Sequence, residues 1–196
     1  AYTDKAEYLH RLSELRALRG DFVKLMVSGM ITFKEYGQLS CDCLQAEEIA
    51  EIIRIAHAEG YAVMLHVNGD AAIRAVLDAG GDSIEHGYFM EDETLRRLAD
   101  SDTVWVPTLA AVDAFVDRPG FNGAIAQETV LRQMDALSRA AAHGAKIASG
   151  SDSGAVGVPH GAGTLEEYRL LEKAGVSEKK IREANELLRE RFRRQD

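Results

Sequence analysis

Five short apolar segments alternate with helix-like segments along this chain, and this order constrains its fold more than any other feature. The strand-like segments span residues 21–29, 61–69, 82–87, 103–109 and 145–154. Amphipathic segments at residues 45–60, 70–81, 90–101 and 124–144 separate them, with further helices expected at 4–18, 164–175 and 177–194. Such alternation predicts an α/β fold with a parallel sheet, either doubly wound or a (β/α) barrel. Since no linker interrupts the pattern, we expect a single domain over residues 1–196.

The first strand-like segment carries a lysine among apolar residues. In "FVKLMVSG" nearly every position except Lys24 is apolar, which is typical of a parallel strand covered on both faces. Burying an unpaired ammonium group is costly. We therefore expect the Lys24 amine to be paired, deprotonated or chemically modified.

Composition excludes several classes of protein. The net charge of −9, from 23 Lys and Arg against 32 Asp and Glu, argues against a nucleic-acid-binding surface. No apolar stretch approaches the ~20 residues that cross a bilayer, and the first residues do not resemble a signal peptide. Cys41 and Cys43 are too close together for a disulfide framework, so we expect free thiols on a loop and a cytoplasmic protein. No glycine-rich phosphate-binding motif follows the first strand, which argues against nucleotide binding.

Four polar residues fall in or near the ends of different strand-like segments. They are Lys24, His66, His86 and Asp152. In a barrel the carboxyl ends of the strands meet at one rim, so these side chains could converge around one or two metal ions. Each also has a simpler explanation, because a lone histidine can bond a backbone carbonyl and a lysine can pair with a glutamate. Their joint placement at successive strand ends favours a shared site.

The sequence resembles the metal-dependent amidohydrolase superfamily, in the branch of imidazolonepropionase-like and Xaa-Pro dipeptidase-like enzymes. The resemblance covers residues 20–175 and is carried by "DFVKLMVSG", "DSIEHG", "VWVPTL" and "IASGSDSG". It implies a (β/α)8 TIM-barrel fold, of which this chain holds about five units, corresponding to barrel strands four to eight.

The resemblance also implies a reaction and a site. It implies that a metal-activated water cleaves an amide or cyclic amide bond in a peptide-like small molecule. Lys24 would be carboxylated and bridge two divalent metal ions, with zinc expected before manganese or cobalt. His66 and His86 would bind one metal, while Asp152 would bind metal and take the proton of the attacking water. The substrate-binding residues implied at the rim are Ser28, Asn68, Thr108 and His160.

The chain departs from the family pattern in ways that keep other functions open. It contains no His-x-His motif, and Asn68 stands where many relatives carry a second histidine. With barrel strands one to three absent, the sheet edges would be open, so we expect association with a second copy or with a missing amino-terminal segment. The main alternative is a non-catalytic half-barrel that serves as a binding or assembly module. A third hypothesis is a metal-free enzyme in which Lys24 forms a Schiff base.

Overall fold

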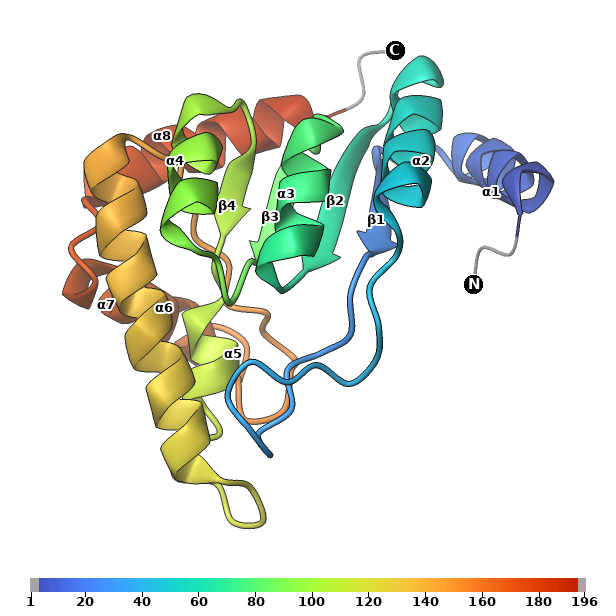
Figure 1. The fold of residues 1–196 in the computed structure, drawn as a ribbon. Helices are drawn as coiled ribbons and strands as arrows, with labels where there is room; N and C mark the ends of the chain where they lie inside the picture. The colour runs from blue at the N-terminus through green and yellow to red at the C-terminus, as the bar shows by residue number, and fades with distance from the viewer. Residues whose placement is uncertain (1–3, 194–196) are drawn as a thin grey trace.

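The computed structural model describes residues 4–193, and its centre is a parallel sheet of four strands (Figure 1). The strands lie in sequence order and are β1 (Phe22–Met26), β2 (Ala62–Val67), β3 (Ser83–His86) and β4 (Val104–Val106). Met26 lies beside His66, and Val67 beside His86, so the first three strands end close to one another. The carboxyl ends of the strands therefore form one edge of the sheet.

Helices connect the strands and complete the chain. They are α1 (Lys5–Ala17), α2 (Ala46–Ala58), α3 (Asp70–Asp78), α4 (Asp92–Asp100), α5 (Leu109–Asp113), α6 (Gly123–His143), α7 (Ala162–Lys173) and α8 (Glu178–Arg191). In Figure 1, α2, α3 and α4 lie side by side along one face of the sheet. The apolar stripe of α2, which includes Ile49, Ile52 and Ile53, is completely buried there. None of the helices formed by the described residues is long and apolar enough to span a membrane.

The prediction of a fifth strand at residues 145–154 is wrong. Ile147 forms only a single parallel bridge with Trp105, held by hydrogen bonds from the Trp105 amide to the Lys146 carbonyl and from the Ala148 amide to the Trp105 carbonyl. The following "SGSDSG" consists of residue types that disfavour strands and form turns. The short helix α5 was not predicted, and Arg194, the predicted end of the last helix, lies outside the described residues.

The predicted burial of the first strand on both faces is also wrong. Within β1 only Val23 is buried, whereas Lys24 is exposed and Met26 is 54% exposed. Alternate residues of a strand point to opposite faces, so Lys24 and Met26 share the face that the connecting helices do not cover. That face is covered at its β4 end, where α8 packs Leu187 and Leu188 beside the buried strand residues.

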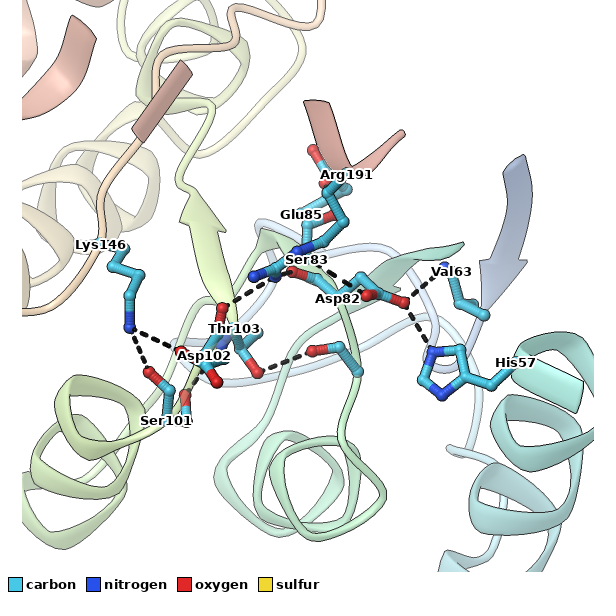
Figure 2. A network of polar contacts seen from close by, with 11 residues as sticks. His57, Val63, Asp82, Ser83, Glu85, Ser101, Asp102, Thr103, Lys146 and Arg191 are labelled. Atoms are coloured by element: carbon cyan, nitrogen blue, oxygen red, sulfur yellow. Dashed lines mark hydrogen bonds and ion pairs between the residues drawn. The ribbon is translucent and has the colours of Figure 1, made fainter. Parts of the chain in front are cut away.

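A polar network ties the amino ends of the strands to the helices (Figure 2). The Asp82 carboxylate accepts a hydrogen bond from the Val63 amide and lies 2.8 Å from His57 Nε2 on α2. Arg191 of α8 donates to the carbonyl oxygens of Asp82 and Asp102, both at 2.8 Å. In a (β/α) barrel, the fold that the sequence predicts, the amino-terminal edge serves stability. This arrangement gives His57 a structural role.

Replacing His57 by glutamine is expected to destabilise the chain more at pH 5.5 than at pH 9. The hydrogen bond to Asp82 raises the pKa of His57, and burial opposes it only in part. A raised pKa in the folded state contributes stability below the unfolded value of ~6.5, and this contribution disappears as pH rises through the folded pKa. Because the pair is partly exposed, the difference should stay below about 1 kcal/mol. Urea unfolding of both proteins at the two pH values measures it, and equal destabilisation at both would contradict the prediction.

Candidate functional site

Two of the predicted metal ligands lie next to each other at the carboxyl edge of the sheet. His66 is the fifth residue of β2 and His86 is the last residue of β3. Their imidazole rings are 4.4 Å apart between centroids, with an angle of 67° between the ring planes. His66 is buried and His86 is half-buried. The parallel register thus brings together two side chains that are 20 positions apart in sequence.

Burial favours the uncharged form of both imidazoles. Burial lowers the pKa of His66, and it lowers the pKa of His86 to about 3, with the charges of His66 and Lys24 acting in the same direction. Uncharged imidazole is the form that binds metal ions. His66 Nε2 lies 3.4 Å from the carbonyl oxygen of Gly29, which can only accept a hydrogen bond. In this arrangement Nε2 carries the proton and Nδ1 keeps the lone pair.

His86 is held at both its ring and its backbone. Its Nδ1 lies 2.7 Å from Thr108 Oγ1. Its carbonyl oxygen accepts hydrogen bonds from Trp105 Nε1 at 2.9 Å and from Gln133 Nε2 at 2.8 Å. When Nδ1–H donates to the threonine hydroxyl, Nε2 keeps its lone pair for another partner. Groups from β4, α6 and the turn before α5 therefore fix the position of one imidazole.

Lys24 lies close enough to act on the protonation of both histidines, and Asp152 on that of His66. Although the Lys24 side chain as a whole is exposed, partial desolvation of its amine lowers the pKa of Lys24, and the carboxylates of Glu85 and Asp152 oppose that shift. Asp152 likewise favours the charged form of His66, whereas Lys24 disfavours it. The structure therefore places the four predicted ligands in one electrostatic neighbourhood. Glu85, which sequence analysis missed, belongs to it as well, and its position directly before His86, the last residue of β3, was the available signal.

The backbone is strained at three of these positions. Five described residues other than glycine have a positive φ, and His86 (71°), Thr108 (52°) and Asp152 (53°) are among them. The left-handed conformation costs a non-glycine residue ~1–2 kcal/mol. Strain of this kind is retained chiefly where function requires it. Its occurrence at three residues of one rim supports a functional site there.

The predicted substrate-binding residues occupy two kinds of position. Ser28 and Asn68 are buried, and the Asn68 amide donates to Ser28 Oγ at 2.8 Å. The Asn68 side-chain oxygen accepts from the Tyr88 amide at 3.1 Å, so these residues tie the ends of β1, β2 and β3 together. Thr108 is buried against His86, while His160 is exposed and lies against Gly154, two residues from Asp152.

A divalent metal ion fits the donor types at this rim, although no complete cage is formed. Within residues 4–193, no group of three or more His, Cys, Asp or Glu side chains is arranged to hold a metal ion. The two uncharged imidazoles supply two nitrogen ligands, and zinc, manganese and cobalt accept imidazole together with carboxylate oxygen. The remaining ligands at this rim would come from Asp152 and from the lysine. Cys41 and Cys43 are free thiols on the loop after β1, as predicted.

Comparisons with known proteins give the chain a consistent set of relatives. The sequence profile described as "Amidohydrolase family" matches residues 5–190. An uncharacterized protein of Mycobacterium tuberculosis is 30% identical over 176 residues, covering 83% of this chain and 44% of that protein. The ochratoxinase of Aspergillus niger is 26% identical over 185 residues, covering 89% of this chain and 36% of the enzyme.

The structural comparison supports the predicted fold. A crystal structure of a Xaa-Pro dipeptidase with bound methionine matches with a TM-score of 0.78 and 25% identity, covering 97% of this chain and 49% of the dipeptidase. The prediction of an α/β fold that represents part of a TIM barrel is therefore confirmed, with four strands in place of five. The chain spans less than half the length of each of these relatives.

Proposed function

The chain belongs to the amidohydrolase family, and from this premise we propose that it forms the metal-binding half of a hydrolase that cleaves an amide or cyclic amide bond in a peptide-like small molecule. The observation that carries the proposal is the contact between the His66 and His86 rings at the carboxyl edge of the sheet. The names of two relatives, a Xaa-Pro dipeptidase and an ochratoxinase, agree with a hydrolase.

Four residues of this chain would hold the metal. His66 would bind through Nδ1 and His86 through Nε2, because their other ring nitrogens already face Gly29 and Thr108. Asp152 would add a carboxylate oxygen. Lys24 would contribute as a carbamate, formed when its uncharged amine attacks carbon dioxide and releases a proton. The lowered pKa of Lys24 accords with that chemistry, because only the uncharged amine reacts.

The proposed role of each residue follows from where its side chain lies. A divalent metal ion, when bound, lowers the pKa of a coordinated water from ~15.7 to about 7 and polarises the scissile carbonyl. Asp152 would accept the proton of the attacking water and return it to the leaving amine. His160, exposed on the same loop, would contact the substrate. The hydrogen bonds of Ser28, Asn68 and Thr108 would hold the strand ends and the His86 ring in position.

Metal loading in the presence of bicarbonate tests the proposal. The purified chain, supplied with zinc and ¹³C-bicarbonate, should retain at least one zinc per chain after gel filtration and show a carbamate carbon signal by NMR. Lys24→Gln should lose the carbamate signal, because it lacks the amine. Lys34→Gln, which changes an exposed lysine on the loop after β1, should keep it. Hydrolysis of dipeptide-like amides is measured on the same samples.

A non-catalytic binding or assembly module is the second candidate. It is favoured by the incomplete cage among the described residues and by the open sheet face that carries Lys24 and Met26. In the hydrolase, a missing amino-terminal segment or a second copy would cover that face. Absence of both zinc retention and the carbamate signal would reject the hydrolase and leave the binding module.

A further inference from the structure

A buried carboxylate from the carboxyl-terminal part of the chain reaches the turn beside His86. Glu167 of α7 is fully buried, and its Oε2 accepts a hydrogen bond from the Ala110 amide at 2.7 Å, across 57 positions of sequence. The amides of Leu109 and Thr108 also favour its charged form, although burial raises the pKa of Glu167 to about 7. Glutamate is almost never fully buried unless it is paired. The complete burial of the Glu167 carboxylate therefore requires an explanation.

The three amides that face Glu167 form the start of α5. A helix begins with amides that have no acceptor within the helix, and a threonine at the capping position usually supplies its own side-chain oxygen. Thr108 is the residue at that position, yet its side chain makes no such bond. The carboxylate of Glu167 supplies the missing acceptor from another helix.

Because Glu167 takes over the capping role, the Thr108 hydroxyl is available for a different partner. Thr108 is held in the left-handed conformation, with φ 52° and ψ 44°, and its Oγ1 lies 2.7 Å from His86 Nδ1. If Thr108 capped α5 with its own oxygen, that oxygen would face the helix amides in place of the imidazole. The contact with His86 thus depends on an acceptor supplied by α7.

Packing alone does not account for a glutamate at position 167. A buried carboxylate without a cation costs stability, and an apolar residue of similar volume is often as favourable or better. Here one oxygen, Oε1, has no hydrogen-bond partner among the described residues. A stability cost at one position is expected where a site gains from it.

We propose that Glu167 is a positioning residue: it caps α5 in place of Thr108, and the freed Thr108 hydroxyl then fixes the orientation and tautomer of the His86 imidazole. The consequence for metal binding rests on the proposed function. The orientation itself is a property of the metal-free chain, so the two can fail separately.

The tautomer of His86 in the metal-free protein tests this inference. Long-range ¹H–¹⁵N correlation spectra at pH 7 should show a predominant Nδ1–H tautomer in the wild type. Glu167→Ala should lower the ratio of Nδ1–H to Nε2–H at least about fivefold, since the Thr108 hydroxyl then turns to the helix. Thr108→Val should have the same effect, and combining it with Glu167→Ala should lower the ratio no further. Thr108→Ser keeps the hydroxyl and should therefore show the wild-type ratio. Glu172→Ala, an exposed glutamate of the same helix, is the control and should change nothing.

Zinc affinity, measured on the same variants, separates the two proposals. Loss of a residue that orients a histidine ligand should weaken zinc about 10- to 100-fold. A tautomer that responds while the wild type binds no zinc would reject the hydrolase and keep the positioning role. A wild-type ratio in folded Glu167→Ala would overturn the positioning role. Glu167→Gln, whose side-chain oxygen can still accept from the Ala110 amide, should keep the wild-type ratio, and a ratio that falls as far as in Glu167→Ala would contradict the capping role. Failure of both variants to fold would also overturn the proposal, because it would assign Glu167 to the folding core.

Discussion

His86→Ala is expected to weaken zinc binding by at least about a hundredfold, because changes around a ligand alone cost ten- to a hundredfold and here the ligand is removed. His66→Ala should have a comparable effect. The reason is geometric: the two rings are 4.4 Å apart and each presents one nitrogen that is not already hydrogen-bonded. Competition of each variant against a chromophoric chelator measures the change in affinity.

The matched control for this experiment is His57→Ala. It also removes an imidazole, but from the amino edge of the sheet, where His57 pairs with Asp82. Its zinc affinity should equal that of the wild type. Circular dichroism in the presence of EDTA shows whether each metal-free variant is folded. If His86→Ala is folded and binds zinc as tightly as the His57→Ala variant does, the two histidines do not hold a metal together.

The order of elements was accessible from the sequence because each element carries its own local signal. The helix α2 shows buried isoleucines at helical spacing, and the strands β1 to β4 are short apolar runs bounded by turn residues. The fifth strand was overestimated because Ile147 and Ala148 are apolar but the serines and glycines that follow do not sustain a ladder. The burial of Lys24 was overestimated because the cover of a sheet face is tertiary information, which a strand's own pattern does not contain.

The candidate site was accessible only in part, for a related reason. The parallel register brings strand ends together, so the positions of His66 and His86 in sequence were enough to predict that they lie close to each other. The groups that hold His86 come from far away: Gln133 is 47 positions distant on α6, and Glu167 lies on α7. No spacing rule links such residues to a strand end. The positive φ of Thr108 also left no signal, because β-branched residues rarely adopt that conformation.

Gly87→Ala is expected to destabilise the chain by about 3 kcal/mol, from ~1–2 kcal/mol of left-handed backbone strain and ~1–3 kcal/mol of overpacking. Gly87 follows His86 directly, and its φ is 62°. A methyl group there would lie 2.5 Å from Trp105 Nε1 and 2.9 Å from Ile84 Cγ2. The indole cannot move away freely, because it is completely buried and donates to the His86 carbonyl.

Gly80→Ala separates the two contributions. Gly80 also has a positive φ, of 74°, but a methyl group there would meet nothing within 4 Å, so this variant should lose only the ~1–2 kcal/mol of backbone strain. Urea unfolding of both variants and the wild type gives the difference. Equal losses would mean that Trp105 yields to the methyl group without cost. A larger loss for Gly87→Ala, accompanied by weaker zinc binding in the fraction that remains folded, would show that the indole and Gly87 together fix the backbone that presents His86.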